Sequence, residues 1–156
     1  ESLKDFFDLL KNKYSISITI CAHPRSNGEI NSFISDYPII KNKAAQLVKN
    51  CSFVICQAST AINFAALFKK PMIFLYNHIA IKNKKTKRNH AAEVDFFAST
   101  FNKRPISIEN LKDFNLKNES KIDENSYDRF ITKYIKSWGP DKTVHEITMN
   151  LLRNQR

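Results

Sequence analysis

The chain is predicted to form an α/β domain in three layers, built on a mainly parallel sheet. Residues 51–75 have the pattern strand, tight turn, helix, strand, and such a unit is normally a right-handed parallel crossover. Its two apolar runs, Phe53–Cys56 and Met72–Leu75, are typical of strands that are covered on both faces. A chain of 156 residues is long enough for one domain, residues 1–156, with a substantial core.

Local patterns predict the other elements in order. Apolar residues at helical spacing indicate helices, alternation indicates a strand in the segment before Cys21, and a strand that starts with Pro is expected at a sheet edge. The expected elements are a helix over Ser2–Asn12, a strand over Ser15–Cys21, an edge strand over Tyr37–Ile40, a helix over Asn42–Asn50, the central unit with its helix over Thr60–Phe68, a helix over His90–Phe101, a strand over Pro105–Ile108, a polar loop over Glu109–Ser126, a helix over Tyr127–Trp138 and a last helix from about Thr143.

The turn of the central unit is the first candidate site. Gln57 and Ala58 leave the strand, and Ser59 is a good N-cap for a helix that is apolar almost all round and therefore expected to be buried. The first helical turn has no acidic residue, and its hydroxyls and N–H groups suit a phosphate. A simpler interpretation, which this stretch alone favours, is that Ser59 only caps a core helix.

A second candidate site follows the strand predicted over Ser15–Cys21. Pro24 keeps His23 out of helical geometry, so His23, Pro24 and Arg25 are expected at the carboxyl end of that strand. Each of these residues alone is best interpreted as part of a surface loop. Because ligands bind parallel sheets beyond the carboxyl ends of the strands, we expect them to converge with Ser59.

The net charge of +10 favours an anionic partner, which means a nucleotide, a nucleic acid or a membrane surface. A compositional bias toward lysine explains it equally well. The segment Lys82–His90 is rich in Lys and Arg and is predicted to be either a solvated loop or a contact for phosphate or acidic lipid. The chain has only two glycines, so glycine-rich phosphate loops are excluded.

Several site classes lack their signatures. Cys21, Cys51 and Cys56 match no zinc pattern and are expected to be reduced and buried in a cytoplasmic protein. No histidine spacing fits a metal site, no Asp-x-Asp motif occurs, and no G-x-S-x-G elbow occurs. No apolar run approaches the roughly 20 residues of a membrane span.

The two candidate sites together resemble a known family. The segments ICAHPR (Ile20–Arg25) and LVKNCSFVICQASTAINFAALFKKPMIFL (Leu47–Leu75) look like the C-terminal, donor-binding half of GT-B glycosyltransferases. The likeness is greatest to bacterial enzymes of capsule and lipopolysaccharide synthesis, including sialyl- and Kdo-type transferases. In that family, a His-Pro histidine contacts the donor nucleotide and a Ser-Ser or Ser-Thr pair holds its phosphate. The matching residues here are His23-Pro24 and Ser59-Thr60.

The resemblance implies a Rossmann-like domain that binds a CMP-, UDP- or GDP-linked sugar, with Arg25, Gln57 and Ala61 beside the two motifs. It implies inverting, metal-independent transfer without a cofactor, to a glycan or lipid-linked acceptor, in the cytoplasm or peripheral to the inner membrane. Asn63 lies where several relatives have a ribose-binding carboxylate. The family's N-terminal acceptor domain, and the strand preceding the first helix, are not among these residues. Two other functions remain open: half of a sugar-nucleotide epimerase, and a non-catalytic nucleic-acid-binding domain.

Overall fold

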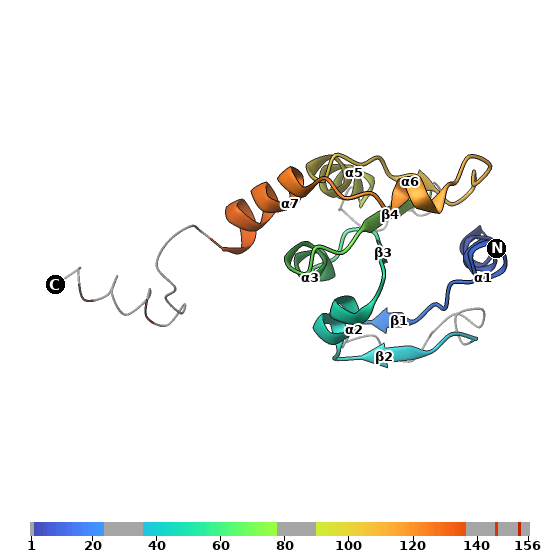
Figure 1. Ribbon diagram of the computed structural model, residues 1–156, viewed down its shortest axis with the longest axis horizontal. Coiled ribbons are helices and arrows are strands. Elements are labelled where there is room, and N and C mark those ends of the chain that lie inside the picture. Colours follow the sequence, from blue (N-terminus) through green and yellow to red (C-terminus); the bar gives the residue numbers. More distant parts are fainter. Residues whose placement is uncertain (1, 24–35, 78–89, 137–145, 147–152, 154–156) are drawn as a thin grey trace.

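The computed structural model describes residues 2–23, 36–77, 90–136, 146 and 153, and its fold is α/β (Figure 1). The expected loop over residues 82–89 and most of the last helix lie outside these residues. In chain order the elements are α1 (Ser2–Tyr14), β1 (Ile20–Ala22), β2 (Ile39–Lys41), α2 (Ala44–Asn50), β3 (Val54–Cys56), α3 (Ala61–Leu67), β4 (Met72–Tyr76), α5 (His90–Thr100), β5 (Ile106–Ser107), α6 (Leu116–Glu119), α7 (Glu124–Phe130) and the π-helix η2 (Ile131–Ile135).

The strands form two parallel sheets. β1 pairs with β2, with Ile20 opposite Ile39, and the other sheet has the order β3-β4-β5. In that second sheet Val54 lies opposite Met72, and Leu75 lies opposite Ile106. The parallel sheet and the crossover through α3 confirm the prediction made for residues 51–75.

Two apolar clusters cover the two faces of the β3-β4-β5 sheet. Because side chains alternate along a strand, Met72 and Phe74 of β4 belong to one cluster and Ile73 and Leu75 to the other. The first cluster is completed by side chains from α2, α3, α5 and α7. The second is completed by α1 and by residues of 106–116. The domain therefore has the predicted three layers.

The helix α7 packs on the first cluster through aromatic side chains. The Phe101 ring lies with its centroid 4.9 Å from that of Tyr127 and 4.8 Å from that of Phe130. Tyr127 is fully buried, and its hydroxyl donates a 2.8 Å hydrogen bond to the Lys70 carbonyl just before β4. Burial of such side chains contributes roughly 1.5–3 kcal/mol each, so α7 is an integral part of the core.

The strand expected over Ser15–Cys21 is shorter than predicted. Ser15 has a left-handed backbone (φ 54°), and the ladder begins only at Ile20, where β2 provides a three-residue partner. The alternation itself is real, because Ile16, Ile18 and Ile20 all pack against the second cluster. The side-chain pattern was thus interpreted correctly, but hydrogen bonding requires a partner strand that the pattern does not reveal.

Two predictions for the C-terminal half are corrected. The segment expected as a polar loop over Glu109–Ser126 contains α6, whose N-cap Asn115 accepts a 3.2 Å hydrogen bond from the Asn118 amide. It also contains the start of α7, which Asp123 caps. The predicted helix over Tyr127–Trp138 therefore begins earlier. Within the described residues it continues as the π-helix η2, and Lys136 is extended.

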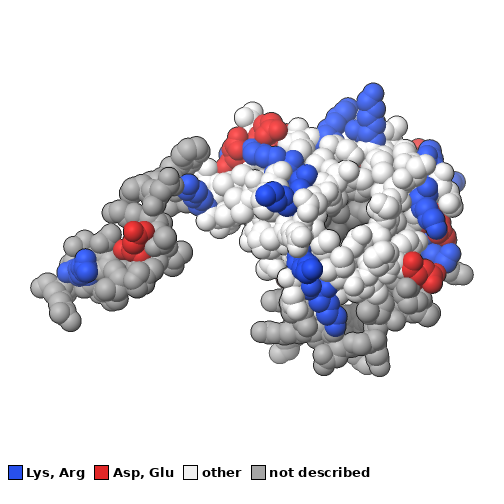
Figure 2. Space-filling model, turned by 60° about the horizontal axis from the view of Figure 1, so that its bottom comes forward, with Lys and Arg blue, Asp and Glu red and all other residues white. Residues whose placement is uncertain are grey.

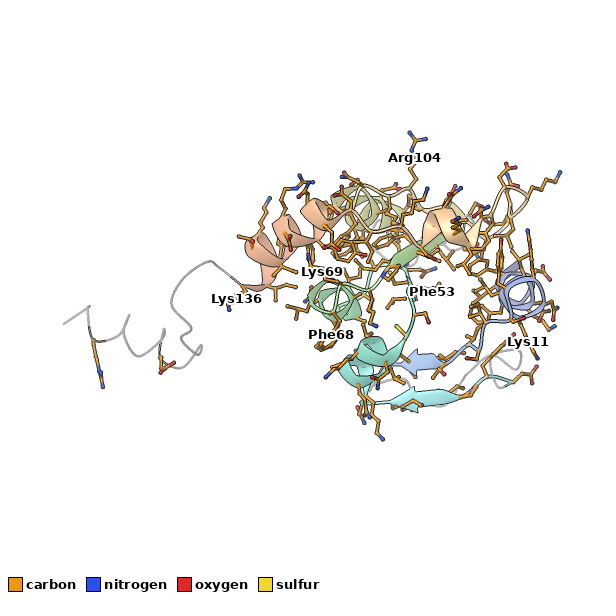
Figure 3. All side chains as sticks on the ribbon, in the orientation of Figure 1. Lys11, Phe53, Phe68, Lys69, Arg104 and Lys136 are labelled. Carbon is orange, nitrogen blue, oxygen red and sulfur yellow. The ribbon has the colours of Figure 1, made fainter. Side chains whose placement is uncertain are left out.

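Two burial predictions are also wrong in part. The helix α3 is apolar almost all round and was expected to be buried, but Leu67 is 44% exposed and Phe68, just after it, is 37% exposed. Figure 3 labels Phe68 beside α3. The buried side of α3 is formed by Ile62, Ala65 and Ala66. Similarly, Cys56 is buried but Cys21 is exposed. Short apolar stretches do not show which side of an element lacks a neighbour.

Candidate functional site

The segment Gln57–Thr60 lies at the carboxyl end of β3 and leads into α3. Gln57, Ser59 and Thr60 are exposed. The helical cap differs from the prediction: Thr60, with φ −63° and ψ −17°, occupies the N-cap position and its side chain makes no capping hydrogen bond. Ser59 still assists, because its Oγ accepts a 3.2 Å hydrogen bond from the Ala61 amide. Two consecutive residues with hydroxyl side chains are therefore exposed at this edge of the sheet.

Three backbone amides at the start of α3, those of Ala61, Ile62 and Asn63, already have partners. Besides the Ala61 amide, the Ile62 amide donates to the Ser59 carbonyl and the Asn63 amide donates to the Thr60 carbonyl, both at 3.1 Å. A phosphate at this point would therefore be held mainly by the hydroxyl protons of Ser59 and Thr60. The expectation that helix N–H groups would serve as free donors does not hold for these three amides.

The structure adds His90 to the site. Its Nε2 lies 3.0 Å from Oε1 of Gln57, which requires Nε2 to carry a proton, since the amide oxygen can only accept. The other ring nitrogen, Nδ1, lies 3.8 Å from a carboxylate oxygen of Glu93. Sequence reasoning placed His90 at the end of the basic segment and at the start of the predicted helix over His90–Phe101, and assigned it no part in the site. The available signal was that His90 follows β4, the neighbour of β3 in the sheet.

Asn63 and Ala61 lie on the first turn of α3. Asn63 is exposed and Ala61 is partly buried. As predicted, the first turn of α3 contains no acidic residue, so no carboxylate there opposes an anion. Asn63 presents an amide where the resemblance leads one to look for an acid.

His23 follows β1 and is exposed. It belongs to the β1-β2 sheet, whereas Gln57–Thr60 follow the β3-β4-β5 sheet. Pro24 and Arg25 lie outside the described residues. The convergence of the two candidate sites therefore stays a prediction.

Cys56 lies directly behind the turn, on the last position of β3. Burial raises the pKa of its thiol to about 12, so the thiol is neutral at physiological pH and is not a nucleophile. Within residues 2–23, 36–77 and 90–136, no three His, Cys, Asp or Glu side chains form a group that could hold a metal ion. In the same part of the chain, no helix is both long and apolar enough to span a membrane.

A groove of about 520 Å³ lies at the other end of the sheet, where residues 101–105 enter β5. Its walls are residues 101–106, 118–119 and 121–123. They are joined by hydrogen bonds from Lys103 to the Glu119 carbonyl and from Asn102 to Asp123. Burial lowers the pKa of Lys103, and the Asn102 hydrogen bond lowers that of Asp123. These contacts attach the α6–α7 connection to the end of α5. The residues that line the groove include none of those in the candidate site, so the two are separate.

Comparisons with protein-family models, with curated proteins and with solved structures give no match.

Proposed function

We propose that this chain is the donor-binding domain of a sugar-nucleotide-dependent glycosyltransferase of surface polysaccharide synthesis. One observation carries the proposal: Gln57, Ser59 and Thr60 are exposed together at the carboxyl end of the parallel strand β3, where α/β sheets bind their ligands. The likeness of Ile20–Arg25 and Leu47–Leu75 to GT-B donor domains supports it. The same resemblance supports a role for Pro24 and Arg25 beside His23.

In the proposed reaction, the acceptor displaces the nucleotide phosphate directly, with inversion and without a metal. The hydroxyls of Ser59 and Thr60 donate to the phosphate as negative charge develops on it, and such preorganised donors lower the barrier. Gln57, held by His90, contacts the nucleotide. We assign no general base to this chain. The donor is a CMP-, UDP- or GDP-linked sugar, and the acceptor is a glycan or a lipid-linked glycan bound by another domain at the cytoplasmic face of the membrane.

Calorimetric titration with CMP, UDP and GDP tests the proposal. We expect weak binding of at least one of them, and we expect Ser59→Ala/Thr60→Ala to weaken it by about 1–3 kcal/mol, because hydrogen bonds to a charged group are lost. The matched control is Ser99→Ala/Thr100→Ala, a second adjacent pair of hydroxyls at the far end of α5. If both double variants bind the nucleotides as tightly as the parent, the phosphate assignment is wrong.

Nucleic-acid binding is a second candidate, which the net charge of +10 favours. On the face shown in Figure 2, the described Lys and Arg side chains stand in separate groups rather than in one stripe. A salt titration distinguishes the two functions: binding to a polyanion weakens with a slope of about −0.9 per neutralised phosphate, whereas a mononucleotide site has a much smaller slope. An epimerase half would be recognised by product analysis, since it converts the sugar without transferring it.

A further inference from the structure

The candidate site lies where two helices begin. β3 and β4 are parallel neighbours, and the chain continues from β3 into α3 and from β4 to α5, which brings the start of both helices to the carboxyl edge of the sheet. Gln57 directly follows β3, and His90 is the first residue of α5. Their side chains meet across this edge, and Glu93, in the first turn of α5, lies beside the same ring.

Each ring nitrogen of His90 faces an oxygen that can only accept a hydrogen bond. Nε2 lies 3.0 Å from Oε1 of Gln57, and Nδ1 lies 3.8 Å from Oε2 of Glu93. The first is a hydrogen-bond distance, whereas the second is too long for a hydrogen bond and is that of an ion pair. Because a ring with protons on both nitrogens is the charged imidazolium, this arrangement fits the protonated form of His90.

The charged group paired with this ring is the carboxylate of Glu93. The described elements next to it contribute uncharged groups: β4, which packs on α5, ends in the phenol of Tyr76, β3 ends in the neutral thiol of Cys56, and the first turn of α3 has no acid. The side chains of His90 and Glu93 are 38% and 40% exposed, so the ring can exchange protons with solvent. Histidine is the side chain that changes charge between about pH 5 and 8.

Loss of one proton from the ring changes the group that Gln57 presents to solvent. The negative charge of Glu93 lies beside Nδ1 and favours the proton that remains there. Nε2 then has a lone pair in place of its proton, and this lone pair repels the Gln57 oxygen. Rotation of the amide by half a turn restores the hydrogen bond, since the amide N–H2 group can donate to Nε2. The N–H2 group therefore points outward when His90 is charged, and the oxygen points outward when His90 is neutral.

We propose that His90 is a positioning residue whose protonation decides which end of the Gln57 amide faces the anion site at Ser59 and Thr60. With His90 charged, Gln57 adds N–H donors to the two hydroxyls, which suits a phosphate. With His90 neutral, Gln57 turns an oxygen toward the site, which repels a phosphate. Anion binding and proton uptake by His90 are then linked, so the affinity falls as the pH rises. The link to a nucleotide phosphate rests on the proposed function, whereas the rotation of the amide does not.

The first test follows the chain without a ligand, by nitrogen nuclear magnetic resonance over the range from about pH 5 to 8. The neutral ring of His90 should carry its proton on Nδ1, and the side-chain amide signals of Gln57 should move in step with the ring. Glu93→Gln should shift this proton toward Nε2, whereas Asp95→Asn, which removes an exposed carboxylate of the same helix, should leave it on Nδ1. A neutral parent ring with its proton on Nε2 would keep the amide in place and overturn the proposal.

The second test uses sulfate as the probe, because its charge is constant over this pH range. Sulfate should shift the backbone signals of Ser59 and Thr60, and it should bind the parent at least about fivefold more tightly at the low end of the range than at the high end. His90→Gln keeps a donor toward Gln57 at every pH, so its affinity should hardly change with pH. Equal pH dependence in the two chains overturns the proposal, as does the absence of shifts at Ser59 and Thr60 at both ends of the range.

The proposed function and the role of His90 fail separately. If CMP, UDP and GDP all fail to bind while the Gln57 amide and the sulfate affinity respond to His90 as described, the nucleotide assignment is wrong and the role of His90 stands. If a nucleotide binds and its affinity changes with pH as much in His90→Gln as in the parent, the role of His90 is wrong. Comparison of these two chains cancels the proton uptake of the nucleotide phosphate itself, which is the same for both.

Discussion

The β3-β4-β5 part and the β1-β2 part of the domain differ sharply in burial. Met72, Ile73, Phe74 and Leu75 of β4 are at most 3% exposed, whereas no residue of β1 or β2 is buried. β4 has a strand on each edge and apolar clusters on both faces. β1 pairs only with β2 among the described strands, and Cys21 on it faces solvent.

This difference shows that a strand's stability comes from its neighbours more than from its own residues. Ile39–Ile40 and Ile73 have similar β propensity, yet only Ile73 has cover on every side. We therefore expect unfolding free energies to be lower locally in the β1-β2 part, since local stability follows buried contacts. Three pairs of substitutions test this difference between the two parts.

The largest effect is expected from the same truncation made in both parts. Ile73→Ala in β4 should destabilise the chain by about 2–5 kcal/mol, since it leaves a cavity in a fully packed site. Ile40→Ala in β2 should cost less, about 1 kcal/mol, because Ile40 is only partly buried. Urea unfolding followed by circular dichroism measures both. Equal losses would mean that β2 is as well covered as β4.

A second contrast concerns the thiols at alkaline pH. Burial raises the pKa of Cys56 in β3 to about 12 from an ordinary value of 9.0, so the unfolded chain loses this proton first. The resulting stabilisation is complete below pH 9 and is lost as the pH rises toward 12, by up to about 1.4 kcal/mol per pH unit. Cys56→Ala should flatten the fall in unfolding free energy between pH 9 and 11.

Cys21→Ala is the matched control for this contrast. Burial also raises the pKa of Cys21, but the residue is exposed. Cys21→Ala should therefore reduce the fall of the unfolding free energy with pH less than Cys56→Ala does. Part of the slope should persist in both variants, because burial also raises the pKa of Tyr127. Equal flattening by the two alanines would show that β3 shields its thiol no better than β1.

The smallest effect is expected from removing one hydroxyl in each part. Tyr127→Phe deletes the part-buried hydrogen bond to the Lys70 carbonyl and should cost about 1 kcal/mol, the usual net contribution of such a bond. Tyr37→Phe, just before β2, keeps the ring contact with Phe7 at 5.1 Å and should change stability by less than about 0.5 kcal/mol. Thermal unfolding compares them, and a larger loss for Tyr37→Phe would contradict the comparison.

The candidate site was predictable only in part. Gln57, Ser59, Thr60 and the acid-free first turn could be recognised because a strand, a turn and a helix adjacent in sequence carry all of them. The contact of His90 with Gln57 joins residues 33 positions apart, so no local pattern indicates it. The N-cap is Thr60 rather than Ser59, a shift of one residue, which is within the usual uncertainty of helix boundaries.

Sequence alone determined the β3–α3–β4 unit, the helix α1 and the inward side chains of Ile16, Ile18 and Ile20, because periodicity reports which residues must leave water. Which strands pair depends on contacts between segments that are distant in sequence. Whether Ser15–Ile20 joins a ladder, whether Leu67 and Phe68 are covered, and whether β1 meets β3 all depend on a neighbour that is distant in sequence. Apolar side chains can be satisfied by any apolar surface, whereas a backbone edge is satisfied only by another strand in register.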